Sequence, residues 1–302
     1  MTAGPAGSPP AQGNAEIPMS RLAHMAADLR ELVRYRELVQ NLVVRDLKVR
    51  YRNSALGFFW SLLNPLAQVF IITLVFKFVI RIGFDNYSAY VLAGFLPWTF
   101  FQMAVLDASQ SILHHGPLLK KVYIPREAVP ISIVISNLIH FGLALLVLFV
   151  YMLILGVPFT WKLVLLPPVI VFHFLLTMGV GLLVSCANVF YEDIKYLMTV
   201  VLNLMYYMVP VLYVLEQLAS IPPRYPWLHA NREGVLFVYQ LNPLAVWITA
   251  YRRILLPPVP ESIGHAPMEP FTVILAALMS VGIAVLGYAV FTKYKWEFAE
   301  HL

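Results

Sequence analysis

Cysteine and charge are both scarce in this sequence. Cys186 is the one cysteine among 302 residues, so the chain cannot form an internal disulfide framework. Charged residues make up 12% of the chain, about half of the roughly 25% usual in soluble domains, whereas hydrophobic residues make up 60%. A soluble core cannot bury that much apolar surface, so the composition indicates a membrane protein. No Cys/His cluster has the spacing of a zinc site, and we expect no metal in this chain.

The motifs of nucleotide binding and of common hydrolases are also absent. The pattern G-x-x-x-x-G-K-[ST], whose backbone amides cradle nucleotide phosphates, does not occur, and neither does a G-x-S-x-G or H-E-x-x-H motif. Asp107 is the one acid inside the apolar runs, which is too few for intramembrane hydrolysis. We therefore expect no catalytic residue and no cofactor in this chain.

A cleavable signal peptide is not evident at the start of the sequence. Residues 1–20 are rich in Pro, Gly and Ala and lack a basic segment followed by an apolar one. Such a composition is typical of a disordered tail.

Six apolar runs are long enough to cross about 30 Å of hydrocarbon, which takes roughly 20 helical residues. Each contains at most one charged residue, and none alternates as the strands of a membrane barrel do. The sequence therefore predicts an all-α membrane protein with spans at 55–80, 88–113, 128–156, 163–190, 196–215 and 271–292.

One further apolar segment, 234–251, is ambiguous. It is short for a span, and Asn242 and Pro243 lie near its middle. If it crossed the membrane there would be seven spans and the C-terminus would be outside. We favour a re-entrant helical hairpin over 216–260, because broken backbone is tolerated at membrane depth where protein covers it.

Basic residues define the expected orientation. Eight lie in 21–52, and the loop between the second and third spans adds three more, whereas the end of the first span and the two short loops on the other side hold only Lys77, Arg81 and Lys162. Because basic residues stay on the cytoplasmic side, both termini are predicted to be cytoplasmic.

Two cytoplasmic segments have helical patterns of their own. Residues 21–52 combine apolar rows with many basic residues, which predicts an interfacial helix against lipid headgroups; a simple topology signal is the alternative. Between the second and third spans, Leu118, Leu119, Val122 and Tyr123 form a short apolar stripe beside two lysines. This stripe suits insertion into a partner's groove, and an ordinary positive-inside loop explains it equally well.

Several stretches together resemble one family. They are 45–57, Trp60, 64–66, 119–127, 193–196, 210–213, 242–244 and 251–252, in an order and spacing that cover about 45–255. The chain resembles the membrane subunit of type-2 ABC exporters, in the branch that exports lipid-linked polysaccharides such as O-antigen and teichoic acid.

The resemblance implies a homodimer in the inner membrane, joined to two copies of a separate ATPase that binds ATP and Mg²⁺, with a lipid-linked glycan as substrate and no nucleic acid partner. It makes 21–52 an interface helix and 216–260 a re-entrant outer gate. It also makes 117–125 a coupling helix that docks on the ATPase. The residues so implied are, for coupling, Pro117, Leu118, Leu119, Lys120, Val122, Tyr123, Pro125 and Arg126, and, for the gate, Pro210, Tyr213, Asn242 and Pro243.

A glycan path should be lined by aromatic side chains, because sugar rings present C–H faces that stack on them and hydroxyls that hydrogen-bond. The candidate lining residues are Phe59, Trp60, Trp98, Phe100, Phe101, Asp107, Tyr206 and Tyr207. Helix packing or lipid contact is the alternative for each aromatic, and pairing with a neighbouring helix is the alternative for Asp107.

The role of the small residues in the last span and the class of substrate both stay open. Ala276, Ser280 and Ala284 suit either a dimer interface or packing within one subunit. A type-2 exporter of drugs or small lipids is the second function that the sequence allows. A channel or secondary transporter is less favoured, since inverted repeats are not evident.

Overall fold

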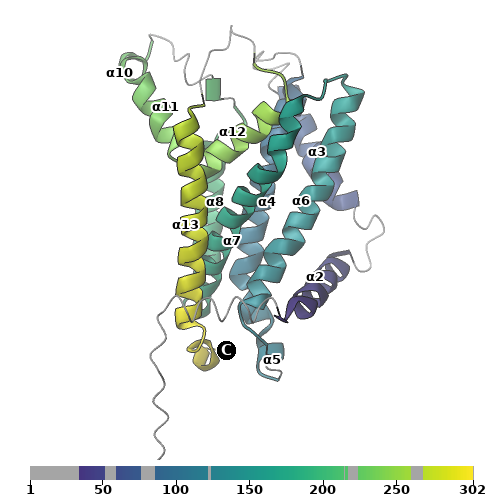
Figure 1. Ribbon diagram of the computed structural model, residues 1–302, viewed down its shortest axis with the longest axis vertical. Coiled ribbons are helices and arrows are strands. Elements are labelled where there is room, and N and C mark those ends of the chain that lie inside the picture. Colours follow the sequence, from purple (N-terminus) through teal and green to yellow (C-terminus); the bar gives the residue numbers. More distant parts are fainter. Residues whose placement is uncertain are drawn as a thin grey trace, which may run out of the picture.

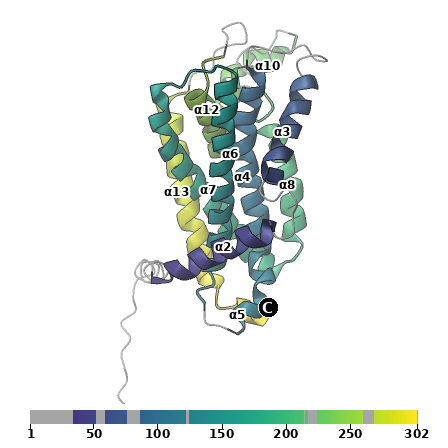
Figure 2. The same ribbon diagram turned by 90° about the vertical axis from the view of Figure 1, so that its right-hand side faces the viewer.

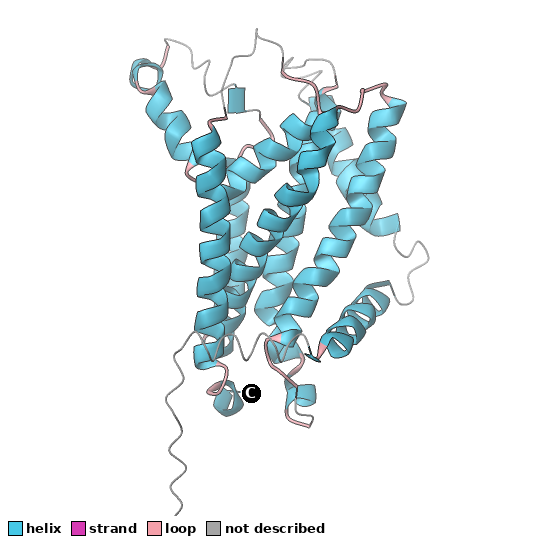
Figure 3. Cartoon of the chain, viewed as in Figure 1, coloured by secondary structure: helices cyan, strands magenta, loops and turns pink. Residues whose placement is uncertain are grey.

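The computed structural model describes residues 34–51, 59–75, 86–121, 124–213, 215–216, 224–259 and 268–301. Every regular element in these ranges is a helix and no strand occurs in them, which confirms the all-α prediction (Figure 3). The long helices stand side by side as one bundle (Figure 1). Four elements are long and apolar enough to cross a membrane: α4 (Tyr87–His114), α6 (Ala128–Ile154), α7 (Leu166–Phe190) with the preceding 3-10 helix η2 (Trp161–Leu165), and α13 (Pro270–Tyr294).

Two shorter helices coincide with the first and fifth predicted spans. Helix α3 (Phe59–Leu74) has 16 residues and α8 (Ile194–Met208) has 15, both fewer than the roughly 20 needed to cross hydrocarbon. The flanks of α3 lie outside the described residues. The structure therefore supports four spans, or five if the bent pair α11–α12 is one span.

One end of the bundle, here called the α2 end, carries the short helices expected on the cytoplasmic side. Helix α2 (Arg36–Tyr51) lies across the foot of the bundle and packs on α6 (Figure 2). Helices α5 (Gly116–Leu119) and α14 (Phe298–His301) project from the same end. The predicted tail 1–20 and the first part of the predicted interface helix, 21–33, lie outside the described residues.

The opposite end, the α12 end, carries the segment predicted to be re-entrant. Helices α10 (Pro226–Ala230) and α11 (Arg232–Gln240) lead into α12 (Pro243–Leu255), and α11 and α12 meet at 94°. The side chain of Asn242 accepts a hydrogen bond from the backbone N–H of Leu244, which caps α12, and Pro243 occupies its first turn. The bend therefore has a local cause in the sequence.

Small residues bring α7 and α13 into close contact. A Cβ added to Gly179 would overlap the backbone of Ile283, and one added to Gly287 would overlap the backbone of Gly179. Ala276, Ser280 and Ala284 are buried on α13. The small-residue series in α13 thus serves packing within one subunit, and a dimer interface built on it is not supported.

Candidate functional site

A cavity of about 560 Å³ opens on the side of the bundle between α3, α4 and α8. The predicted residues Trp98, Tyr206 and Tyr207 line it together with six residues that were not predicted to line it: Gln68, Phe95, Thr99, Gln102, Met103 and Asn203. Its described lining therefore combines aromatic rings with three side-chain amides and includes no ionisable acid or base other than tyrosine.

The rings and amides of this cavity are held by one another. The ring centroid of Tyr206 lies 5.8 Å from that of Trp98 and 5.3 Å from that of Tyr207. Trp98 Nε1 donates to Gln102 Oε1 at 3.1 Å, and Gln102 Nε2 donates to Asn203 Oδ1 at 3.4 Å. Three of these residues lie on α8 and two on α4, so contact between the two helices builds the wall.

Phe100 and Phe101 lie elsewhere, although they neighbour Trp98 in sequence. Both are buried, and their rings pack around the imidazole of His173 at centroid distances of 5.2 and 6.4 Å. They belong to the interior of the subunit rather than to the cavity. Phe59 and Trp60 begin α3, but their side chains lie outside the described part of the structure.

Asp107 pairs with α2 rather than lining the cavity. Arg50 Nη2 donates to Asp107 Oδ2 at 2.7 Å, and Asn137 Nδ2 donates to the same oxygen at 3.0 Å. Ser136 Oγ donates to Asp46 Oδ2 at 2.5 Å. These bonds attach one face of α2 to α4 and α6, which explains why Asp46 and Arg50 lie on the packed side of that helix.

The predicted coupling segment begins with the short helix α5. Pro117 and Lys120 are exposed, Leu119 packs on the apolar cluster at the α2 end, and Pro125 is buried. Two further predicted residues, Val122 and Tyr123, lie outside the described part of the structure. The side chain of Leu118 lies outside it too. A guanidinium N–H of Arg126 donates to the backbone carbonyl of Lys295, so the end of the segment is attached to the C-terminal part of the chain.

His115 links this segment to α2. It follows the last residue of α4 and contacts the guanidinium of Arg45. Burial lowers the pKa of His115, a hydrogen bond to the Ser111 carbonyl partly opposes this, and the charge of Arg45 adds to the lowering, so the neutral ring is favoured.

Sequence reasoning missed a buried ion pair beside the coupling segment. Lys295 Nζ lies 3.1 Å from Glu127 Oε1, and the two side chains are only 10% and 2% exposed. Lys295 follows a span and Glu127 precedes one, so both look like ordinary flanking charges in the sequence. Within the described ranges, no group of three His, Cys, Asp or Glu residues could hold a metal ion.

At the α12 end, Arg252 makes the densest set of polar contacts. It is buried, and it donates to four backbone carbonyls: Tyr90 at 2.9 Å, Pro210 at 2.8 Å, Val211 at 2.5 Å and Tyr213 at 2.7 Å. Gly94 provides the space, since a Cβ there would lie 2.5 Å from Arg252 Nη2. The segment after α8, with the predicted gate residues Pro210 and Tyr213, is thereby tied to α12.

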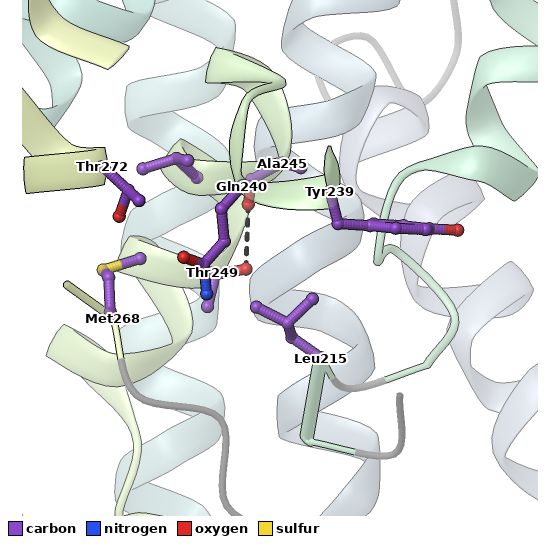
Figure 4. A pocket seen from close by; sticks show the side chains of 8 residues that line it. Leu215, Tyr239, Gln240, Ala245, Thr249, Met268 and Thr272 are labelled. Atoms are coloured by element: carbon purple, nitrogen blue, oxygen red, sulfur yellow. Dashed lines mark hydrogen bonds between the residues drawn. The ribbon is translucent and has the colours of Figure 1, made fainter. Parts of the chain in front are cut away.

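The remaining predicted gate residues, Asn242 and Pro243, lie at the bend between α11 and α12. Below this bend is a small pocket of about 10 Å³, lined by residues of α11, α12 and the start of α13 (Figure 4). Thr249 Oγ1 donates to the Ala245 carbonyl within it at 2.8 Å, drawn as a dashed line in Figure 4. A space of this size holds no sugar, so we do not regard it as a binding site.

A bundle of membrane-length helices with short helices at one end and a bent helix pair at the other defines a polytopic membrane protein. The family model described as "ABC-2 type transporter" matches residues 37–256, and the chain belongs to this family.

The chain is 32% identical over 280 residues to the O-antigen export system permease protein RfbA of Myxococcus xanthus, covering 91% of this chain and 98% of the relative. It is 28% identical over 270 residues to a Klebsiella pneumoniae protein of the same name, covering 88% and 95%. It is also 21% identical over 225 residues to the polysialic acid transport protein KpsM of Escherichia coli, covering 69% and 80%. The resemblance to polysaccharide exporters is confirmed.

Proposed function

We propose that this chain is the channel-forming permease subunit of an ATP-driven exporter that moves a lipid-linked polysaccharide across the inner membrane. Its relatives are named for O-antigen export and polysialic acid transport. The observation that carries the proposal in the structure is the cavity whose accessible wall is formed by Tyr206, Tyr207, Gln102 and Asn203, with Trp98, only 1% exposed, packed behind them.

This lining matches the surface of a sugar polymer. Ring faces stack on the C–H faces of sugars, and amides both donate to and accept from hydroxyls. The second function, export of drugs or small lipids, would be served by an apolar wall without the three amides. The mixed wall therefore favours a glycan.

The same side of the subunit suits a dimer. Helix α8 buries only Leu202, and its outer face exposes Tyr196, Leu197, Val200, Leu204, Tyr207 and Met208. Helix α3 exposes Leu63, Phe70, Ile71 and Leu74 on the other flank of the cavity. We propose that a second copy related by a two-fold axis covers this side and encloses the cavity as a channel.

We further propose six spans, with α3 and α8 as the first and fifth, an interface helix that includes α2, and a re-entrant gate from α11 and α12. The start of α2 and helix α14 lie at the same end of the bundle, as an even number of crossings requires (Figure 1). The basic residues of α2 favour that end as cytoplasmic. Residues 117–125 there would dock on a separate ATPase that binds ATP and Mg²⁺.

Surface polysaccharide measured in a gene-deletion strain tests the proposal. Tyr207 is 69% exposed, so Tyr207→Ala removes a cavity ring without unpacking the core. We expect this variant to restore several-fold less surface polysaccharide than the unmodified protein. Phe271→Ala is the matched control, because Phe271 is 63% exposed on α13, away from the cavity. Equal export by the two variants at equal protein levels would contradict the assignment.

A further inference from the structure

The two limbs of the bent pair, helices α11 and α12, differ strongly in how much of their surface is packed against the bundle. Helix α12 buries eleven of its thirteen residues, whereas α11 buries none. Helix α12 packs on α4, α7 and α13, whereas the main helix contacts of α11 in the described residues are with its chain neighbours α10 and α12. Because local opening starts where few side chains are buried, α11 is the limb that can move.

Arg252 adds a polar anchor to the packing of α12. Its four bonds join α12 to α4 through Tyr90 and to the segment 210–213. Tyr87 of α4 also donates to the carbonyl of Leu212, at 3.0 Å. Moving α12 away would break four bonds from the Arg252 guanidinium to carbonyls, and such a bond is stronger than one between neutral groups. Helix α12 and the segment 210–213 therefore move only together with α4.

A pair of hydroxyls connects the loosely held limb to this anchored segment. The Tyr213 hydroxyl lies 2.9 Å from the Met208 carbonyl and 2.8 Å from the Tyr239 hydroxyl on α11. The Tyr213 hydroxyl is the donor in both contacts, and because a hydroxyl has one proton, the Met208 carbonyl and the Tyr239 hydroxyl share it as acceptors. The bond between the two hydroxyls is neutral and partly exposed, and it is weaker than the bonds of Arg252.

We propose that α12 is the fixed part and α11 the moving limb of the outer gate, with Arg252 positioning the fixed part and the Tyr239–Tyr213 hydroxyl bond holding the gate closed. The hinge is the bend between Gln240 and Pro243. This inference rests on the proposed transport function, and it assigns roles to Arg252 and Tyr239 that the predicted gate residues did not include. Opening breaks the Tyr239–Tyr213 hydrogen bond and leaves the buried network of Arg252 intact.

Ion leak through the purified protein reconstituted in liposomes tests the closing bond without any ATPase or glycan. Tyr239→Phe keeps the ring, whose centroid lies 6.4 Å from that of Tyr213, and removes only the hydroxyl. We expect potassium leak to rise roughly three- to tenfold, the range set by losing one neutral hydrogen bond. Tyr225→Phe is the control, since it removes a hydroxyl from an exposed residue just before α10, in the segment that leads into α11. Leak unchanged by Tyr239→Phe would overturn the closing role.

Hydrogen exchange on the same samples tests the anchor. In the unmodified protein, amides of 232–240 should exchange at least tenfold faster than those of 243–255. Arg252→Lys keeps the charge but loses the planar fork, and it should speed exchange in 209–213 and in α12 while leaving α13 unchanged. Equal exchange in α11 and α12, or a variant that speeds exchange across the whole bundle, would overturn the fixed-limb assignment. Normal surface polysaccharide in the deletion strain would instead refute the transport function and leave these results standing.

Discussion

Removing the amine of Lys295 tests the buried ion pair at the α2 end. In Lys295→Met the carboxylate of Glu127 loses its partner at 3.1 Å, and that side chain is 2% exposed. Glu127 Oε2 has no hydrogen-bond partner among the described residues, so none of them offsets the loss of the Lys295 ammonium through that oxygen. Leaving one member of a buried pair without its counter-charge costs about 3–5 kcal/mol. The Arg126 bond to the Lys295 carbonyl stays, because it uses the backbone.

Thermal unfolding of the purified protein in detergent measures this cost. At about 2–4 °C per kcal/mol for a chain of this size, Lys295→Met should lower Tm by roughly 6–20 °C. Adding Glu127→Gln removes the buried charge itself and should recover more than half of the loss. A single variant that costs under about 1 kcal/mol, or a double variant no more stable than the single one, would refute the reasoning.

Two further predictions concern packing and pH. Gly179→Val should cost several kcal/mol, roughly the range of severe overpacking, because any side chain there meets the backbone of Ile283. Gly282→Val, with open space around its Cβ position, is the control, and similar Tm values for the two would contradict the close approach. Since burial lowers the pKa of His115, protonation is favoured in the unfolded chain, and stability should fall as pH drops below about 6.5. His115→Gln should flatten that part of the stability profile between pH 7.5 and 5.5, and an unchanged slope would count against a half-buried neutral ring.

The long helices were predictable because length and hydropathy alone identify them. Runs at 88–113 and 128–156 became α4 and α6 almost residue for residue. Which side of a helix faces a cavity was not predictable in the same way. Trp98 and Phe101 are both aromatic and both lie on α4, yet one lines the cavity and the other packs on His173. Helix α4 is buried on most sides, so its hydropathy carries no directional signal.

The polar residues show a second limit of the sequence. Arg252 follows an apolar stretch and reads as a flanking charge, although it is buried against four carbonyls from distant segments. Its partners are backbone atoms, which leave no pattern of residue types. Gly94 was a usable signal in principle, because a glycine within a long helix often marks close approach. Asp107, in contrast, pairs with a neighbouring helix, which is one of the two roles that an acid within a span predicts.

The central claim is that this chain carries a polysaccharide out of the cytoplasm. Deleting its gene in the source organism and measuring the polymer on each side of the inner membrane tests this most directly. The account predicts that surface polysaccharide disappears while lipid-linked polymer accumulates in the cytoplasm, and that the unmodified chain restores export. Undiminished surface polysaccharide in the deletion strain, with no polymer retained inside, would contradict it.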